Sequence, residues 1–188
     1  MRVITGEAKG RKLKGPPSVA TRPMQDKIKE ALFSALESLE PDISRVLDLY
    51  AGTGGIGIEA LSRGAEWADF VEQQRAACDV ITWNLAHTGL AGRSAVHQLP
   101  VPTYIRRRSE PYDLVILDPP YADSEIAATL ESLSESQLVE SGSIVVLGHW
   151  PKFDSASVTG NLTLLKRRCH GDSCFSIFEV QRGVATKE

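Results

Sequence analysis

The amino-acid sequence predicts an α/β fold built on a doubly wound, mostly parallel sheet of seven strands. Between residues 45 and 147, short aliphatic runs alternate with segments of helical periodicity, a pattern typical of parallel strands joined by helices. A glycine-rich turn follows the first of these strands and opens a helix, as in nucleotide-binding α/β folds. After residue 160, two strands follow each other with no helix-length segment between them, which predicts an antiparallel C-terminal pair.

Residues 1–20 are expected to form a small basic hairpin ahead of a main domain at residues 21–188. Gly6 and Gly10 separate short apolar pairs, as hairpin turns do. Residues 1–29 hold eight Lys and Arg against two acids, a net charge of +6, whereas the rest of the chain carries −9. This asymmetry favours a polyanionic partner, although a solvated surface would carry the same charge. The basic side chains concerned are Lys9, Arg11, Lys12, Lys14 and Arg22.

The expected elements follow one another in the order that a doubly wound sheet requires. A helix starts at Thr21-Arg22-Pro23, with a hydroxyl cap and a proline in its first turn, and Pro41 ends it. Gly64 and Gly89 are expected to close the helices after the first two core strands. Strands are predicted at residues 45–50, 67–72, 94–97, 114–117, 143–147, 162–165 and 175–180, and further helices at 75–88, at 101–108 and through 126–133.

Composition argues against a membrane span, a disulfide framework and a metal site. No apolar run approaches the roughly 20 residues that span a bilayer, and the N-terminus lacks a signal-peptide core, so a cytoplasmic location is expected. Cys78, Cys169 and Cys174 are odd in number and include no C-x-x-C pair. Disulfides are therefore not expected, and the cysteines have too few neighbouring ligands for a metal. The four histidines form no constellation and are expected to be surface or packing residues.

The glycine-rich turn fits two classes of cofactor. Gly52, Gly54 and Gly57 match G-x-G-x-x-G, and Glu72 lies 20 residues beyond Gly52, where an acid binds a ribose hydroxyl. An NAD-dependent oxidoreductase would show the same pattern. Asp48, however, lies inside the preceding strand, where a pyrophosphate-binding strand is usually apolar. An acid at that position suits a cationic ligand, such as the amino group or sulfonium of S-adenosylmethionine.

A second motif, Asp118-Pro119-Pro120-Tyr121, follows the aliphatic strand at residues 114–117. Because proline has no N–H and restricts the backbone before it, this turn offers acceptors in fixed places. The Asp118 carboxylate and the Pro119 carbonyl can each accept one hydrogen of an exocyclic –NH₂ group, while Tyr121 stacks on its ring. Ligands of open α/β sheets bind outside the carboxyl ends of neighbouring strands, so this turn and the glycine loop are expected to meet. A stiff loop without chemistry remains the alternative for the motif alone.

These motifs together resemble the RsmD family of bacterial methyltransferases. The resemblance rests on Val46-Leu47-Asp48-Leu49-Tyr50-Ala51-Gly52-Thr53-Gly54, on the segment 57–65, on Thr21-Arg22-Pro23 and on Asp118-Pro119-Pro120-Tyr121, and it covers essentially the whole chain. It implies a Rossmann-like class I S-adenosylmethionine-dependent enzyme that methylates N2 of one guanine in small-subunit (16S) ribosomal RNA. It also implies catalytic residues Asp118, Pro119, Pro120 and Tyr121, with the cofactor at Asp48, Tyr50, Ala51, Gly52, Thr53, Gly54, Gly57, Glu72, Gln73 and Gln98.

The expected partner is ribosomal RNA or the small ribosomal subunit, including an assembly intermediate, and the chain is expected to act as a monomer in direct in-line methyl transfer. Two positions depart from the family. Met24 replaces a small hydroxyl residue, and Gln98 follows the third strand where the family has an acid near the adenine. Three alternatives stay open: an amino-methyltransferase that acts on adenine N6 or glutamine, an NAD-dependent oxidoreductase, and a non-catalytic RNA-binding module.

Overall fold

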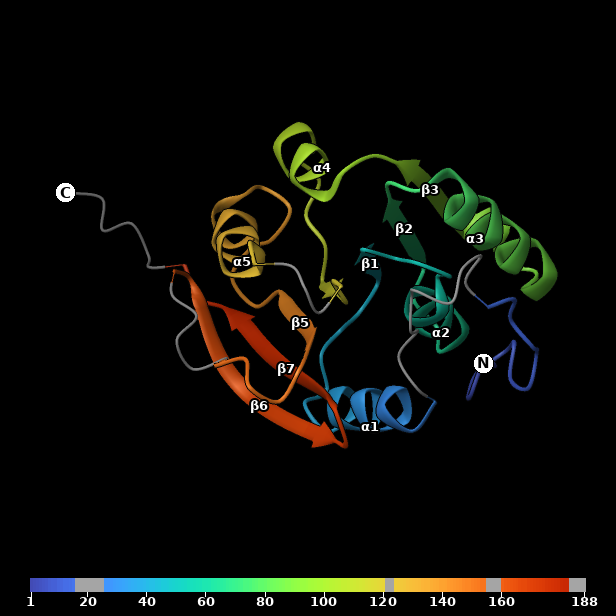
Figure 1. Cartoon of the computed structure of the whole chain (residues 1–188), viewed down its shortest axis with the longest axis horizontal. Helices are drawn as coiled ribbons and strands as arrows, with labels where there is room; N and C mark the ends of the chain where they lie inside the picture. Colours follow the sequence, from blue (N-terminus) through green and yellow to red (C-terminus); the bar gives the residue numbers. More distant parts are fainter. Residues whose placement is uncertain (16–25, 121–123, 155–159, 183–188) are drawn as a thin grey trace.

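The seven strands form one sheet in the order β3-β2-β1-β4-β5-β7-β6, as the computed structural model shows for residues 1–15, 26–120, 124–154 and 160–182 (Figure 1). Strands β1 to β5 are parallel, and β7 runs antiparallel to both β5 and β6. The predicted doubly wound sheet with its antiparallel C-terminal pair is therefore confirmed. The strands are β1 (Arg45–Leu49), β2 (Trp67–Glu72), β3 (Ser94–Gln98), β4 (Leu114–Leu117), β5 (Ile144–His149), β6 (Leu162–His170) and β7 (Ser173–Val180).

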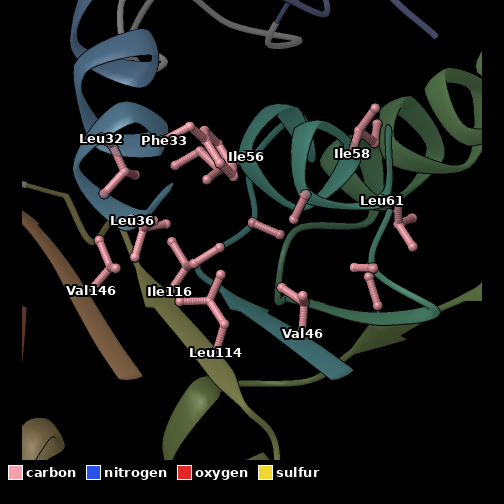
Figure 2. Packing of buried hydrophobic residues seen from close by; sticks show 14 of the residues in the cluster. Leu32, Phe33, Leu36, Val46, Ile56, Ile58, Leu61, Leu114, Ile116 and Val146 are labelled. Carbon is pink, nitrogen blue, oxygen red and sulfur yellow. The ribbon is translucent and has the colours of Figure 1, made fainter. Parts of the chain in front are cut away.

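In the described part of the chain, five α-helices cover the two faces of the sheet. They are α1 (Asp26–Glu37), α2 (Gly55–Ser62), α3 (Arg75–Thr88), α4 (Val101–Arg107) and α5 (Ile126–Glu135), with a 3₁₀ turn, η1, at Ala91–Arg93. Apolar side chains of α1, α2 and α3 pack with β1, β4, β5 and β7 in one cluster, whereas those of α4 and α5 form a second cluster on the other face. In Figure 2, Leu36 of α1 and Ile56 of α2 lie over Ile116 of β4. Within the described ranges, no helix is long and apolar enough to cross a membrane.

The central strands are buried on both faces, which explains their continuous apolar sequence. All four residues of β4 and all six of β5 are buried, as expected for parallel strands covered by helices on both sides. Edge strand β6 is different, because most of its residues are exposed and its second half is polar. Apolar alternation therefore predicted only residues 162–165 of a strand that extends to His170. Pairing with β7, and not apolar patterning, extends it.

The N-terminal hairpin is docked on α2. Arg2 and Lys12 pair across it, and Val3 and Leu13 belong to the core cluster. The Glu59 carboxylate of α2 accepts hydrogen bonds from the amides of Ile4 (2.8 Å) and Thr5 (2.9 Å). This cover explains why every residue of α2 is buried. The start of the first helix at Thr21-Arg22-Pro23 and the contacts of Met24 lie outside the described residues.

The expectation that the cysteines form no disulfide was wrong for one pair. Cys169 and Cys174 are joined, with an S–S distance of 1.98 Å and a Cα–Cα distance of 4.0 Å. The two residues face each other across the turn between β6 and β7. Cysteine counting could not find this pair, because only the strand register brings the residues together. Cys78, the third cysteine, is free and buried.

Candidate active site

Three carboxylates gather where β1, β2 and β4 end. Asp48 is the penultimate residue of β1, Glu72 is the last residue of β2, and Asp118 directly follows β4. Strand β1 pairs in parallel with both β2 and β4, so that Leu49 lies opposite Val71 and Leu117. The two predicted motifs therefore meet at one edge of the sheet, at the carboxyl ends where open α/β sheets bind ligands.

Asp48 is buried, and its environment resists a negative charge. Burial raises the pKa of Asp48 to about 8, with further repulsion from Asp118 and Glu72, while a hydrogen bond from the Gly57 amide works in the opposite direction. That bond joins Gly57 N to Asp48 Oδ2 over 2.9 Å. A Cβ on Gly57 would lie 2.5 Å from the Phe70 ring, so only glycine lets the amide approach. An anion in this position is stabilised by a nearby cation.

Three residues of the glycine loop have positive φ angles. Tyr50, Gly52 and Gly54 have φ angles of +59°, +56° and +75°, in the left-handed region that glycine adopts readily. Gly54 is the N-cap of α2. Glu72 ties this loop to β2, because its Oε2 accepts a hydrogen bond from Gly52 N (3.1 Å) and its Oε1 accepts one from Gln74 N (2.8 Å). The Glu72 carboxylate is thus oriented toward the loop.

The remaining predicted cofactor residues surround this loop. Ala51 and Thr53 are buried in it, and Gln73 is exposed immediately after β2. Gln98, exposed at the end of β3, lies opposite Glu72 in the strand register, so the two side chains lie on the same face of the sheet. The strand register therefore places Gln98 beside Glu72. Whether Gln98 contacts an adenine stays a prediction.

His97, next to Gln98, points into a separate buried network. Its Nε2 lies 2.6 Å from Asp69 Oδ1, and Asp69 Oδ2 accepts a hydrogen bond from the Tyr112 hydroxyl (2.9 Å). Burial would raise the pKa of Asp69, but hydrogen bonds from His97, Tyr112 and Trp67 outweigh it and lower the pKa. His97 is therefore a packing residue, as its sequence context indicated.

The turn after β4 places an acid beside a glycine of the neighbouring strand. Burial raises the pKa of Asp118 to about 6. Pro119 is buried and Pro120 exposed, whereas Tyr121 lies outside the described residues. Gly148 of β5 is next to Asp118: a Cβ on Gly148 would lie 2.3 Å from Asp118 Oδ1. Sequence reasoning missed Gly148, although a glycine near the end of an otherwise aliphatic strand often marks close approach of another group.

His149 follows Gly148, but its ring contacts other residues and not the turn after β4. Its Nδ1 lies 2.8 Å from the Trp150 carbonyl oxygen, and its Nε2 lies 2.9 Å from Ser176 Oγ. Burial lowers the pKa of His149, although the Trp150 contact opposes that change. With both ring nitrogens engaged, His149 packs β5 against β7.

Four of the predicted basic residues lie on the N-terminal hairpin. Lys9 and Lys12 are exposed, Arg11 Nη1 donates to the His87 carbonyl oxygen (2.7 Å), and Lys14 Nζ lies 3.9 Å from the centre of the Trp83 ring. Arg22 lies outside the described residues. Among the residues that the structure describes, no group of three or more His, Cys, Asp or Glu side chains could hold a metal ion.

Comparison with known proteins gives consistent matches over almost the whole chain. A family model described as Conserved hypothetical protein 95 matches residues 1–179. The chain is 33% identical to "Putative rRNA methyltransferase YlbH" of Bacillus subtilis, over 95% of this chain and 98% of that one. It is 28% identical to "Ribosomal RNA small subunit methyltransferase D" of Escherichia coli K12, over 95% and 89% of the two chains. The solved structure of "Putative methyltransferase yhhF from Escherichia coli" superposes with a TM-score of 0.84 at 28% identity, over 96% of this chain and 98% of that one.

Proposed function

We propose that this chain, which belongs to the family described as Conserved hypothetical protein 95, methylates the exocyclic N2 amine of a guanine in small-subunit (16S) ribosomal RNA. The resemblance to the RsmD family is confirmed by relatives that match over 95% of the chain, and the Rossmann-like methyltransferase fold is confirmed by the solved structure. Enzymes of this kind take their methyl group from S-adenosylmethionine, which confirms the predicted cofactor. The choice of guanine N2, and the role of each residue, are our proposal.

The residues at the carboxyl edge fit this cofactor. S-adenosylmethionine carries a sulfonium and an ammonium group, and a cation near Asp48 would offset the burial that raises the pKa of this acid to about 8. Glu72 is held toward the glycine loop by its bonds to Gly52 and Gln74. Each of its oxygens retains a lone pair for a ribose hydroxyl. Gln98 and neighbouring backbone groups would contact the adenine.

The single observation that carries the proposal is the juxtaposition of Asp118 with these two acids. The Asp118 carboxylate and the Pro119 carbonyl would accept the two hydrogens of the target amine, which directs the nitrogen lone pair toward the methyl group. The nitrogen–carbon bond then forms as the sulfur–carbon bond breaks. The sulfur leaves as a neutral thioether, so positioning is the main contribution of the protein. Asp118, with its pKa raised to about 6, accepts the proton that the nitrogen releases.

The target base must leave its helical stack to reach this edge, at a cost of a few kcal/mol. In the proposed complex Tyr121 stacks on the base, and the basic hairpin contacts phosphates. Phosphate contacts orient an RNA without reading its sequence. The identity of the guanine would therefore be decided by the shape of the RNA or of the assembled subunit around it.

The test is to incubate the protein with S-adenosylmethionine labelled in its methyl group and with two substrates, unmodified 16S RNA and small subunits assembled from it. Digestion to nucleosides and mass spectrometry identify the product. Labelled N2-methylguanosine supports the proposal, and comparison of the two substrates shows whether free RNA or the subunit is methylated. Labelled N6-methyladenosine would replace the guanine assignment with the adenine alternative. No labelled nucleoside from either substrate would overturn the proposal.

A further inference from the structure

Trp83 is a large aromatic side chain that the fold leaves in solvent. It lies on the outer face of α3 with 40% of its surface exposed, while the adjacent Asn84 and Leu85 are buried. Within the described ranges, the other exposed large hydrophobic residues are Leu39, Leu164 and Leu165, none of which is aromatic. Trp83 therefore has no role in the core, and its position calls for another explanation.

Aromatic and basic groups from two distant segments gather around Trp83. The His87 ring, one turn further along α3, stacks on it with 4.7 Å between ring centres and 15° between planes. Lys14 of the hairpin places its ammonium 3.9 Å from the Trp83 ring centre. Arg11, also of the hairpin, donates to the His87 carbonyl oxygen over 2.7 Å. We call these four residues, Arg11, Lys14, Trp83 and His87, the Trp83 surface.

Hydrogen bonds of Asn84 fix the backbone beneath the Trp83 surface. Asn84 is fully buried, and its Oδ1 accepts a hydrogen bond from Lys14 N (2.8 Å). The Asn84 amide nitrogen donates to the carbonyl oxygens of Thr53 (2.9 Å) and Lys14 (3.3 Å). The backbone of Lys14 is thus fixed to α3 and, through Thr53, to the glycine loop. The flexible Lys14 side chain can leave the ring while its backbone stays in place.

The local charge favours a polyanion. Asp79 lies one turn before Trp83, but it pairs with Arg75 at 3.0 Å. Glu7, on the same hairpin as Lys14, pairs with Arg93. These nearby acids are therefore paired with other cations, and Lys14 and Arg11 make the Trp83 surface positively charged. A positively charged aromatic surface is the usual means of binding single-stranded nucleic acid.

We propose that the Trp83 surface binds an unpaired nucleotide of RNA, and this inference rests on the proposed function, which makes RNA the substrate. The base stacks on the Trp83 indole. The Lys14 ammonium moves from the ring to the neighbouring phosphate, and Arg11 pairs with the same phosphate backbone. Stacking on an aromatic ring tolerates any base, so this contact contributes affinity and not the choice of target.

This site is distinct from the amine site. Trp83 lies eight residues into α3 from Arg75, or about 12 Å along the helix axis, and α3 begins directly after the end of β2 that carries Glu72. The Trp83 surface would therefore hold a part of the RNA that is not the reacting guanine. Its loss should weaken RNA binding without slowing methyl transfer once the RNA is saturating.

The test compares Trp83→Ala, Trp83→Phe and a matched control, Leu165→Ala, whose side chain is also 40% exposed but lies on β6. Affinity for single-stranded oligonucleotides is measured by fluorescence anisotropy. Because stacking contributes about 1–3 kcal/mol per base, Trp83→Ala should bind about 5- to 150-fold more weakly. Trp83→Phe should stay within a few-fold of wild type, and so should Leu165→Ala. Equal affinities of Trp83→Ala and Leu165→Ala would overturn the proposal.

A second measurement reads the contact directly. RNA should quench tryptophan fluorescence in the wild type, and this quenching should shrink in Trp83→Phe, which retains Trp67 and Trp150. Unchanged quenching in Trp83→Phe would also overturn the proposal. If RNA quenches Trp83 and Trp83→Ala binds RNA more weakly, but no nucleoside is methylated, the proposal for the Trp83 surface stands and only the proposed function is overturned. If the wild type methylates RNA and Trp83→Ala binds RNA normally, the proposed function stands and the proposal for the Trp83 surface is overturned.

Discussion

Asp48 and Glu72, the two acids proposed to face the cofactor, are held differently from Asp118, which is proposed to face the target amine. Asp48 and Glu72 are bonded to backbone amides of the glycine loop and of the turn after β2. Within the described part of the chain, the Asp118 carboxylate accepts no hydrogen bond; it lies in a space that Gly148 leaves open. In the proposed enzyme, two acids therefore shape the loop around the cofactor, while the third keeps its acceptor capacity for the target amine.

This difference predicts that the two sides respond differently to mutation. Changes on the cofactor side should alter binding and backbone geometry together, because the acids and the loop share hydrogen bonds. Changes on the amine side should alter the rate of transfer and leave both ligands bound. Four variants test this contrast, from the largest expected effect to the smallest.

Asp118→Ala should give the largest loss. Removing a positioned acceptor at the reacting atom should lower the rate of methyl transfer about 10²–10³-fold, by analogy with the loss of one donor from an oxyanion site. Affinities for S-adenosylmethionine and RNA should not change. Single-turnover methylation with both ligands saturating measures the rate. Asp42→Ala, an exposed acid outside this edge, is the control, and a rate for Asp118→Ala equal to that of the control would return the turn to a purely structural role.

Gly148→Ala should lower the rate of transfer almost as much, although Gly148 has no chemistry of its own. The new Cβ would lie 2.3 Å from Asp118 Oδ1, so the carboxylate must move. Misplacement of a catalytic group by about 1 Å can cost about 10²-fold in rate. Gly92→Ala is the matched control, because a Cβ there meets nothing within 4 Å. If Gly148→Ala also weakens calorimetric binding of the cofactor, the effect is on the fold of the edge and not on Asp118.

Glu72→Ala should act on the cofactor. The loss of hydrogen bonds to a charged acceptor costs about 1.5–3 kcal/mol, or roughly 10- to 150-fold in affinity. Because Glu72 also accepts bonds from Gly52 and Gln74, Glu72→Gln should lose less, since its amide oxygen can still accept one of them. Calorimetric titration with S-adenosylmethionine measures both variants. Equal affinity of wild type and Glu72→Ala would contradict the ribose assignment.

Asp48→Asn should give the smallest change of the four variants. Unlike the other three, it should be a gain, because the substitution should stabilise the folded protein. Since the folded protein raises the pKa of Asp48 from 3.8 to about 8, it binds this proton more tightly than the unfolded chain does. The free energy of unfolding therefore falls as the pH rises from about 4 to about 8. Asparagine removes this dependence, so the variant should melt at a higher temperature at pH 8, by about 2–4 °C for each kcal/mol of stability recovered. Below pH 4 the two proteins should melt alike.

The same substitution should weaken binding of the cofactor, because a neutral amide no longer attracts the cationic groups of S-adenosylmethionine. Thermal scans of wild type and Asp48→Asn across this pH range, with and without S-adenosylmethionine, separate the two effects. A variant that is less stable than wild type at pH 8 would show that the Asp48 charge is compensated inside the free protein.

Local sequence was sufficient to predict most of the fold. The helix at Arg75–Thr88 has its predicted bounds, and Gly89 closes it in the left-handed conformation. Helix α2 is different, because the predicted closure at Gly64 falls one residue beyond the observed cap, Arg63. Apolar periodicity, glycine and proline influence the backbone only a few residues away. They therefore predict which elements are present better than they predict where each element ends.

By itself, the sequence determined the order of strands and helices along the chain, the glycine loop after Asp48, and the acceptor-rich turn at Asp118, since each depends on residues close together in the chain. Only the tertiary structure decided what lies against them. Gly148 beside Asp118, Lys14 over Trp83, and Cys169 bonded to Cys174 all depend on register and packing. Such contacts join residues whose side chains carry no local signal for one another, because the sheet register and the docking of the hairpin, and not the neighbouring sequence, bring them together.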